Sequence, residues 1–437
     1  MQTNFTPQQL EDPHVDFSEK ILRKCVHCGF CTATCPTYLI LGDELDSPRG
    51  RIYLIKDMLE NGKPADVKIV KHIDRCLSCL ACTTTCPSGV DYMHLVDHAR
   101  IHIQQTYKRP FMDRLFRAVL AMVLPYPSRF RFALHAAKLA KPFAGLFAKI
   151  PAMKPMAAML FLAPTSLPAA IKLPIVTSAK TSKVGRVAML SGCAQQVLDP
   201  RINAATLELL SRIGVEIVVP AKEGCCGALV HHMGREDASL AAAKNNIDAW
   251  WHEIENGGLD AIIITTSGCG TTVKDYGHML RLDPDYAEKA KTIASLAKDI
   301  TEYLSSRELD GVEKGRKLKL AYHSACSMQH GQKIKDEPKR LLSAVGFDVV
   351  DIPEGHLCCG SAGTYNILQS EIAGRLKERK LRNIAKVKPD LIAAGNIGCL
   401  TQLSADVGVP MCHTIELLNW AYGGAMPKGM EGILGEA

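Results

Sequence analysis

Sixteen of the seventeen cysteines fall into four groups of four, and two of these groups share one tight spacing. Both have the form Cys-x2-Cys-x2-Cys-x3-Cys-Pro and begin at Cys25 and at Cys76. This spacing is typical of the bacterial ferredoxin motif, which binds a [4Fe–4S] cluster. Where a protein has two such motifs, the fourth cysteine of each binds the other cluster. The predicted ligands are Cys25, Cys28, Cys31 and Cys86 for the first cluster, and Cys76, Cys79, Cys82 and Cys35 for the second.

Zinc is the alternative occupant, because pairs of cysteines two residues apart also bind zinc. Zinc sites use two separated pairs, whereas this chain has two complete ferredoxin motifs, so the spacing favours iron and sulfide. Arg49 and Arg51 follow the first motif. They could offset the negative charge of the clusters, or they could simply form the solvated start of a helix.

The other two groups show that the second half of the chain is a duplication. Each copy has a single cysteine, then a Cys-Cys-Gly triplet 32 positions later, then another single cysteine. Residues 259–269 also align without gaps on residues 389–399. The cysteines are Cys193, Cys225, Cys226 and Cys269 in the first copy, and Cys326, Cys358, Cys359 and Cys399 in the second.

Short apolar runs end just before these cysteines, and helical stretches separate the runs. This alternation predicts a parallel sheet covered by helices in each copy. Because sites in such sheets form beyond the carboxyl ends of the strands, the four cysteines of each copy are expected to converge. The expected strands are 184–190, 215–219 and 261–264, then 318–322, 347–352 and 391–394, with helices that include 201–213 and 334–345.

The connections around the ferredoxin motifs are predicted to be helical. Residues 48–59 begin with a proline suited to a first helical turn and place their apolar residues on one face. A second helical pattern covers residues 92–107. Helical connections of this kind resemble the α-helical ferredoxin domains of succinate and fumarate reductases.

Length and composition indicate a protein of several domains. A chain of 437 residues suggests about three domains, and its 47% hydrophobic and 22% charged residues are ordinary for a globular protein. The polar, acidic amino terminus argues against a secretory signal peptide and for the cytoplasm. The net charge of +7 is concentrated between Lys108 and Lys172, where eleven basic residues stand against one acid. No nucleic-acid-binding motif accompanies this charge, so nucleic acid is not an expected partner.

The basic segment 108–183 is rich in proline, which limits its helices to about three or four turns. Its longest uncharged run, 155–171, is interrupted by Pro164 and Pro168 and is too short for a transmembrane helix. The amphipathic stretches 111–124 and 130–150 could lie on an anionic membrane surface. The alternative is a linker that wraps neighbouring domains or docks a partner subunit.

The chain lacks the motifs of nucleotide and flavin binding. No predicted strand is followed by GxGxxG, and GxxxxGK[ST] does not occur. We therefore expect no flavin or NAD on this chain and no residue that is catalytic in substrate oxidation. Such an electron carrier needs a flavin-containing partner as donor and an acceptor such as quinone.

The duplicated pattern resembles the CCG (cysteine-rich) domains of heterodisulfide reductases. In members that bind a cluster, the pattern ends in Cys-x2-Cys, but this chain has Thr272 and Gln402 at the two final positions. Cys412 and His413 could supply a substitute, although an inert buried cysteine is the simpler interpretation. His231, His232 and His323 could each be a ligand or a proton carrier, but isolated histidines more often have other roles, so none is predicted as a site residue. The eight cysteines of the repeats could bind a metal or a further cluster, form a redox-active thiol set, or support the Cys-Cys-Gly turns structurally.

Over residues 17–437, the order of domains resembles one family of electron-transfer proteins. It includes the iron-sulfur subunits of glycolate oxidase, lactate-utilisation iron-sulfur proteins, and the corresponding subunits of anaerobic glycerol-3-phosphate dehydrogenase and of heterodisulfide reductase. Stretches such as CVHCGFCTATCPTY and SPRGRIYLIKDMLENG look most like the glycolate oxidase members.

This resemblance implies an electron-transfer subunit of a glycolate dehydrogenase complex. Flavin-containing partner subunits would oxidise glycolate to glyoxylate, and this chain would pass the electrons to an acceptor such as quinone. The implied location is the cytoplasm, with peripheral contact to the inner membrane as an option. The alternatives are an iron-sulfur subunit of a glycerol-3-phosphate or lactate dehydrogenase, and a thiol/disulfide enzyme like heterodisulfide reductase.

The predicted fold class is α plus α/β, with an N-terminal α-helical two-cluster ferredoxin domain followed by two repeated α/β CCG domains. The predicted parts are the ferredoxin domain at 1–107, the basic Pro-rich linker at 108–183, the first CCG domain at 184–310 and the second at 311–437.

Overall fold

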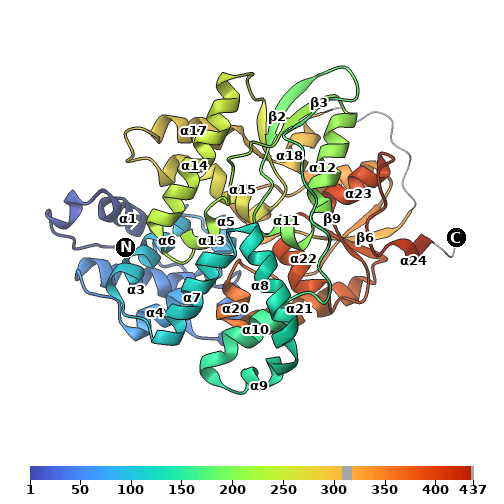
Figure 1. Cartoon of the computed structure of the whole chain (residues 1–437). Coiled ribbons are helices and arrows are strands. Elements are labelled where there is room, and N and C mark those ends of the chain that lie inside the picture. Colours follow the sequence, from blue (N-terminus) through green and yellow to red (C-terminus); the bar gives the residue numbers. More distant parts are fainter. Residues whose placement is uncertain (308–316, 435–437) are drawn as a thin grey trace.

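The computed structural model describes residues 1–307 and 317–434. It shows a helical N-terminal region, a helical linker and two α/β repeats in chain order (Figure 1). This arrangement confirms the predicted fold class of α plus α/β. The predicted boundary between the two repeats, at residues 310 and 311, lies outside the described residues.

Short helices surround both ferredoxin motifs, and the two predicted helices are α3 and α6. The Ser47 side chain accepts a hydrogen bond from the Gly50 amide, and Pro48 occupies the first turn, so α3 begins where the sequence predicts. Ile55 and Met58 on its inner face are fully buried in a core shared with α6. The elements are η1 (Gln9–Glu11), α1 (Pro13–Lys24), η2 (Phe30–Thr32), α2 (Pro36–Leu41), η3 (Glu44–Asp46), α3 (Pro48–Glu60), α4 (Val67–Asp74), α5 (Ala81–Thr85) and α6 (Tyr92–Thr106).

The basic linker is a series of helices, coloured teal to green in Figure 1. The stretch 130–150 is not one helix, because Pro142 lies in a 3-10 turn between α8 and α9. Among the described residues, none of the helices combines the length and the apolar character needed to cross a bilayer. The elements are α7 (Phe111–Val123), α8 (Pro127–Ala140), η4 (Lys141–Phe143), α9 (Ala144–Ala148), η5 (Pro151–Met153) and α10 (Lys154–Leu162).

The first repeat forms a five-stranded sheet in the order β1-β3-β2-β4-β5. β1 comes from the segment assigned to the linker and runs antiparallel to β3, while the other neighbours are parallel. β2, β3 and β4 are the three predicted strands. The elements are β1 (Val176–Thr177), β2 (Gly185–Met189), α11 (Gln195–Leu198), α12 (Arg201–Arg212), β3 (Val215–Val218), α13 (Ala228–His231), α14 (Glu236–Glu255), β4 (Ala261–Ile264), α15 (Ser267–Lys274), α16 (Tyr276–Met279), α17 (Ala287–Leu296), β5 (Ala297–Asp299) and α18 (Ile300–Ser305).

The second repeat forms a parallel four-stranded sheet in the order β7-β6-β8-β9. β6, β7 and β8 are the predicted strands, and the helix expected at 334–345 begins three residues later as α19. The elements are β6 (Lys319–His323), the π-helical turn η6 (Ser327–Gln332), α19 (Glu337–Ala344), β7 (Asp348–Asp351), α20 (Tyr365–Leu368), α21 (Ser370–Val387), β8 (Leu391–Ala394), α22 (Ile397–Leu403), β9 (Met411–His413), α23 (Thr414–Ala421) and α24 (Glu431–Leu434).

The two repeats pack against each other around one shared core. α12 of the first repeat packs on α23 of the second, and α18 of the first packs on α19 of the second. Because α12 corresponds to α19 and α18 corresponds to α23, the contacts are reciprocal, as they are at a two-fold interface. Buried residues from both sheets, including Ile263 and Leu320, belong to the same apolar cluster.

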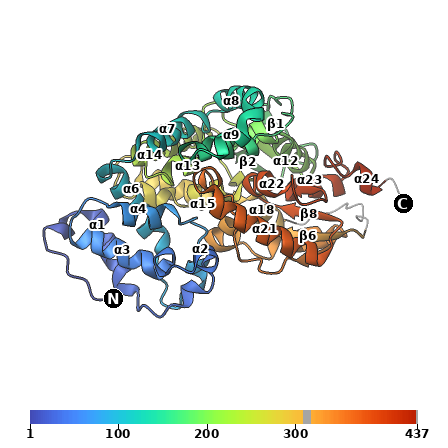
Figure 2. The same cartoon turned by 90° about the horizontal axis from the view of Figure 1, so that it is seen from below.

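The ferredoxin region lies against both repeats (Figure 2). α2 packs on α21, and α5 packs on η6 of the second repeat. The Tyr365 hydroxyl of α20 donates to the Arg75 carbonyl at 3.0 Å. On the other side, His94 of α6 contacts Asp275 of the first repeat at 2.8 Å. The ferredoxin motifs are thus held in a fixed position relative to the cysteines of the repeats.

Candidate metal centres

A surface pocket brings together the cysteines predicted for the first cluster. The chain turns sharply between them because His27 and Gly29 have left-handed backbone, with φ of 56° and 85°. Cys28 is exposed, which places this site at the molecular surface. The cysteines that line the pocket are Cys25, Cys28, Cys31 and Cys86, together with Cys82 of the second motif.

The cysteines predicted for the second cluster are buried. Left-handed backbone at Ser78 and Leu80, with φ of 49° and 60°, turns the chain within this motif as well. Burial raises the pKa of the Cys82 thiol, and the charges of the other three thiols raise it further, so the four lie near one another. Their exposure is 8% for Cys76, 8% for Cys79, 8% for Cys82 and 5% for Cys35.

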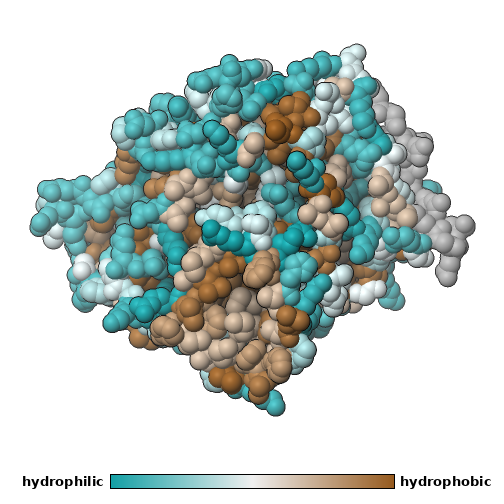
Figure 3. All heavy atoms as spheres, viewed as in Figure 1, coloured by the Kyte–Doolittle hydropathy of each residue, from teal (hydrophilic) through white to brown (hydrophobic). Residues whose placement is uncertain are grey.

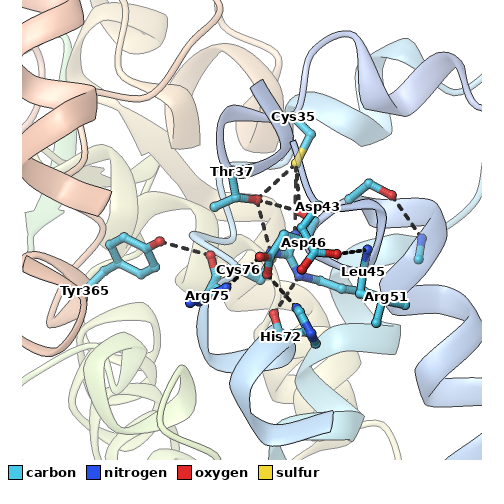
Figure 4. A network of polar contacts seen from close by, with 12 residues as sticks. Cys35, Thr37, Asp43, Leu45, Asp46, Arg51, His72, Arg75, Cys76 and Tyr365 are labelled. Carbon is cyan, nitrogen blue, oxygen red and sulfur yellow. Dashed lines mark hydrogen bonds and ion pairs between the residues drawn. The ribbon is translucent and has the colours of Figure 1, made fainter. Parts of the chain in front are cut away.

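Arg51 lies in the interior beside the second set of cysteines, at 1% exposure (Figure 4). Its Nε donates to the His72 carbonyl at 2.7 Å, and its Nη2 donates to Thr37 Oγ1 at 3.0 Å. Nη1 lies 4.0 Å from Cys35 Sγ, and Nη2 lies 3.5 Å from Asp46 Oδ1. The solvated helix start that the sequence left open is therefore wrong for Arg51.

The Cys76 thiol is surrounded by groups that favour its ionised form. Burial alone would raise the pKa of Cys76, but the charges of Arg51 and Arg100 and a hydrogen bond from Tyr92 lower it. The Tyr92 hydroxyl donates to Cys76 Sγ at 3.6 Å, and Arg100 Nη2 donates to the Cys76 carbonyl at 2.8 Å. A thiolate is the form that binds metal, so these residues fit an iron–sulfur cluster.

Arg49 stands in a different environment from Arg51, although both belong to α3. Its side chain is 34% exposed and pairs with Glu44 at 2.8 Å. It lines the pocket of the first set, and its Nη1 donates to the His27 carbonyl at 3.4 Å. Arg49 is therefore a partly solvated charge beside the first site.

The four cysteines of the second repeat converge at the carboxyl edge of its sheet. Cys326 Sγ lies 3.7 Å from Cys358 Sγ, and Cys359 Sγ lies 3.6 Å from Cys399 Sγ. Gly360 has a φ of 92°, and a Cβ there would lie 2.6 Å from a backbone oxygen of α21, so only glycine fits this turn. The predicted convergence is present in this copy.

The cysteines of the first repeat are neighbours in the same order. Contact with Cys225, together with burial, raises the pKa of Cys193, and contacts with Cys225 and Cys269 raise the pKa of Cys226. Asn246 of α14 accepts from the Gly224 amide and donates to the Cys225 carbonyl. A neutral side chain therefore supports this Cys-Cys turn.

The residues that replace the final cysteine of the CCG pattern have structural partners. Thr272 donates to the Gly268 carbonyl, and Gln402 accepts from the Asn366 amide at 3.0 Å. Cys412 of β9 pairs with Ala393 of β8, and both residues belong to the apolar core shared by the two repeats. Cys399 packs instead with Ile392, whose side chain lies on the opposite face of the sheet. Cys412 is thus a buried core residue apart from the other thiols.

Two residues that the sequence interpretation missed stand beside the thiols of the second repeat. His323, the last residue of β6, is 2% exposed, and burial together with the Lys380 charge lowers its pKa to about 3. Lys380 of α21 is also 2% exposed and donates to the Glu354 carbonyl at 3.0 Å. Aligning Cys193 with Cys326 places His323 opposite Leu190, and this difference between the copies was the available signal.

The second ferredoxin motif touches the cysteines of the second repeat. Cys79 and Cys358 pack in one buried cluster, with Cys326 against it. Burial and the neighbouring Cys326 thiol raise the pKa of Cys79. In the sequence Cys79 stands 247 positions from Cys326 and 279 positions from Cys358, and nothing in it indicated this contact.

A histidine pair joins α6 to the first repeat. His94 contacts the Asp91 carboxylate through Nδ1 at 2.5 Å and the Asp275 carboxylate through Nε2 at 2.8 Å. Its ring stacks on His278 with centroids 3.6 Å apart. Burial opposes a charge here, but the hydrogen bonds to Asp275 and Asp91 raise the pKa of His94 to about 10. His94 is therefore an imidazolium that bridges two parts of the chain at neutral pH.

Comparison with known proteins agrees with this arrangement. Residues 21–90 match the 4Fe-4S dicluster domain, and residues 187–274 and 320–404 each match the cysteine-rich domain. The chain is 42% identical over 423 residues to the glycolate oxidase iron-sulfur subunit of Escherichia coli K12, covering 96% of this chain and 99% of the relative. The chain belongs to this family.

Further relatives differ in how much of the chain they cover. A probable glycolate oxidase iron-sulfur subunit of Bacillus subtilis is 31% identical over 92% of this chain and 94% of the relative. A lactate utilization protein A of Geobacillus thermodenitrificans is 28% identical over 54% of this chain and 98% of its own length. The predicted family and the predicted pair of [4Fe–4S] clusters are thereby confirmed.

Proposed function

We propose that this chain is the iron–sulfur electron-transfer subunit of a complex that oxidises glycolate to glyoxylate. The observation that carries the proposal is the pair of complete cysteine sets in a chain that is similar along its whole length to glycolate oxidase iron-sulfur subunits. Substrate oxidation belongs to flavin-containing partner subunits, and quinone is the proposed acceptor. The proposed parts remain 1–107, 108–183, 184–310 and 311–437.

The proposed ligand sets cross between the two motifs. Cys25, Cys28 and Cys31 share their pocket with Cys86, the last cysteine of the other motif, which supports their assignment to one cluster. Cys35, the last cysteine of the first motif, lies with Cys76 around the Arg51 guanidinium, which supports the second set. Cys79 and Cys82 complete that set. Bound there, the clusters would supply one-electron transfer.

The surroundings of the two sets suggest different roles. The first set includes the exposed Cys28 and adjoins Val26 and Phe30, which are 66% and 64% exposed. An apolar, exposed rim of this kind suits docking of a partner subunit, so we place electron exchange with that subunit here. The second set is enclosed, and the buried Arg51 offsets its negative charge.

A lactate-oxidising complex is the second candidate for the parent complex. Its support is the match of 54% of this chain to a lactate utilization protein A. A glycerol-3-phosphate dehydrogenase and a thiol/disulfide enzyme like heterodisulfide reductase remain alternatives with less support, because two glycolate oxidase relatives cover nearly the whole chain, at 42% and 31% identity. Co-purification from the host, followed by identification of the flavoprotein and its substrate, distinguishes the candidates.

The linker is the proposed point of contact with the inner membrane, on its cytoplasmic face. Figure 3 shows apolar side chains gathered over α9 and α10 at the lower end of the molecule. Leu139 and Phe161 are 83% and 62% exposed, and Phe143 and Leu146 are 57% and 59% exposed. Exposed lysines such as Lys138 adjoin this surface. Apolar side chains beside lysines are suited to anionic lipid.

Vesicles that contain phosphatidylglycerol test this contact. Replacing both Phe143 and Leu146 by Ser is expected to weaken co-sedimentation of the full chain about tenfold or more, because each exposed apolar side chain contributes roughly 1–2 kcal/mol when buried. Leu282→Ser, at a 52% exposed apolar position in the first repeat, is the matched control and should bind as the parent does. Equal binding by all three proteins would contradict membrane contact through the linker.

The electron-transfer role is tested by Cys79→Ser in the assembled complex. Reduction of the partner's flavin by substrate should remain, while electron delivery to quinone should fall strongly. Cys412→Ser, at a buried thiol outside both sets, is the control and should leave turnover intact. Unchanged turnover in Cys79→Ser would show that the second set is not on the electron path.

A further inference from the structure

A cavity apart from the cysteine sites lies where the ferredoxin region meets the first repeat. Helices α1 and α6 form one side of it, with α13 and α14 of the first repeat opposite them (Figure 1). The cavity holds about 480 Å³, part of which is open to solvent. Five of the fifteen histidines in the chain line it, together with Arg281. A hollow of this size with converging polar groups is typical of a site for a small ligand.

Arg281 brings a positive charge into this cavity, and the described residues give it no carboxylate as an ion-pair partner. Its guanidinium donates to the His278 carbonyl at 3.0 Å and to His14 Nδ1 at 3.4 Å, and it lies over the Phe17 ring at 5.3 Å from the centroid. Burial lowers the pKa of Arg281, and the charges of nearby acids only partly oppose this. A half-buried cation without a counter-ion is costly, so a bound anion would stabilise it.

Asp275, the acid with the largest effect on Arg281, already has another partner. His94 contacts Asp275 through Nε2 at 2.8 Å and carries a charge at neutral pH. His94 also stacks on His278, and burial together with the charges of His94 and Arg281 lowers the pKa of His278 to about 3. His278 is therefore a neutral imidazole in a positive environment, and no described residue hydrogen-bonds to its ring. Its N–H group is available to an oxygen atom in the cavity.

We propose that this cavity binds a small monocarboxylate, with Arg281 as the main contact and His278 as a second hydrogen-bond donor. The planar guanidinium presents parallel N–H groups that match the two oxygens of a carboxylate. A neutral imidazole adds one further N–H donor. The apolar side chains of Phe17, Leu240 and Met279 line the same cavity and suit a short carbon chain. The cavity thus offers both a counter-charge and an apolar wall.

Glu236 makes a phosphate less suitable than a monocarboxylate. It lines the same cavity, and its charge reaches Arg281 without an ion pair between them. A phosphate, which is more highly charged than a carboxylate, would be repelled more strongly. A metal cation is disfavoured by the charges of Arg281 and His94. In the described part of the chain, the groups of three potential metal-ligand atoms that lie within 4.8 Å of one another are all elsewhere.

A bound carboxylate would connect two parts of the chain. His14 and Phe17 belong to α1, which precedes the first ferredoxin motif, whereas His278 and Arg281 belong to the first repeat. Binding should therefore raise the thermal stability of the chain. Glycolate and glyoxylate are monocarboxylates, so the cavity would respond to the substrate or product of the complex, a consequence that rests on the proposed function. The binding itself does not depend on that function.

Isothermal titration calorimetry of the full chain, purified with its clusters, tests the proposal with acetate and glycolate as probes. We expect about one molecule of either probe per chain, with a Kd of about 1 mM or tighter. Inorganic phosphate at the same ionic strength should bind about tenfold more weakly or worse. The measurement needs neither turnover nor a partner subunit, so its failure would leave the electron-transfer role standing. The absence of saturable binding, or phosphate binding as tight as that of acetate, would overturn the proposal.

Variants of three charged residues identify the contacts. Arg281→Gln should weaken acetate binding about tenfold or more, because it removes a charge-assisted hydrogen bond. The electron paramagnetic resonance (EPR) signals of both clusters should stay unchanged in this variant. Arg129→Gln is the matched control, because Arg129 also donates to a backbone carbonyl and lies over an aromatic ring, and it should bind acetate as the parent does.

Glu236→Gln should improve phosphate binding about threefold or more, because it removes a repelling charge. A gain of binding cannot come from misfolding, so this variant supports the site even where Arg281→Gln is less stable than the parent. The proposal is overturned if Arg281→Gln binds acetate as tightly as the parent, or if both arginine variants weaken binding equally. It is also overturned if Glu236→Gln leaves phosphate binding unchanged.

Discussion

Replacing Arg51 by Gln should make the second [4Fe–4S] cluster harder to reduce. Arg51 is enclosed, and its Nη1 lies 4.0 Å from Cys35 Sγ. Its charge therefore favours the more negative, reduced form of a cluster bound to that thiolate. Asp46 keeps hydrogen bonds from Arg75 at 2.8 Å and His72 at 2.9 Å in the variant, so the local fold should persist.

The size of the effect follows from Coulomb's law. An added electron spreads over the cluster, so we take about 8 Å, twice the measured separation, as its distance from the guanidinium. With an effective dielectric constant of about 20, the lost interaction is about 2 kcal/mol. For a one-electron step this corresponds to a fall in midpoint potential of about 90 mV.

Anaerobic redox titration followed by EPR measures this shift for each cluster. Arg51→Lys keeps the charge and should shift the potential much less. Arg49→Gln removes a partly solvated charge on the same helix, and its effect should be small and confined to the first cluster. If Arg51→Gln left the second potential unchanged, or if Arg49→Gln lowered it equally, the argument from buried charge would be refuted.

Three further predictions concern single residues. Gly360→Ala should destabilise the chain by about 1–3 kcal/mol in denaturant titration, because Gly360 has a φ of 92° and an added Cβ would meet backbone atoms. The control is Gly145→Ala, where the space around the glycine is open. It should be neutral or stabilise the chain by up to about 1 kcal/mol. Tyr92→Phe removes a hydrogen bond to Cys76. Because such a bond contributes about 0.5–1.5 kcal/mol, the midpoint potential of the second cluster should fall by about 20–60 mV. An unchanged potential would mean that the bond is not made. The pKa of His94 is about 10 in the folded chain and near 6.5 in the unfolded chain. The stabilisation of the fold by the charged His94 is therefore complete below about pH 6.5 and is lost as the pH rises toward 10. The loss of stability in His94→Asn should be largest at about pH 6, and a loss that does not change with pH would contradict this.

Local patterns were sufficient to predict much of the fold. Each of the six predicted strands is long or apolar enough to be recognised from its own sequence, without knowledge of its neighbours in the sheet. The start of α3 is likewise marked locally, by Ser47 and Pro48. β5 and β9 have only three residues each, and their pairing with β4 and β8 defines them. Nothing in so short a segment distinguishes a strand from a loop, so both were missed.

Buried charge could not be predicted from local sequence. Arg51 looks like a surface residue at the start of a helix, and its burial depends on Thr37, Asp46 and His72, which the fold brings around it. Lys380 lies in a helix with many charges, yet it is buried and donates a hydrogen bond to the Glu354 carbonyl. The sequence thus offered Arg51 as a possible counter-charge without showing its burial, and it gave no indication of Lys380.

The two repeats began as copies, but only one of them adjoins the second ferredoxin motif. Cys358 packs with Cys79, whereas no contact of this kind joins Cys225 to the motif among the described residues. Cys358→Ser should therefore alter the EPR signal or potential of the second cluster, and Cys225→Ser should leave both unchanged. Both variants remove a thiol from a corresponding Cys-Cys-Gly turn, so a general loss of stability would affect them alike. Equal effects of the two substitutions would show that position beside Cys79 does not distinguish the repeats.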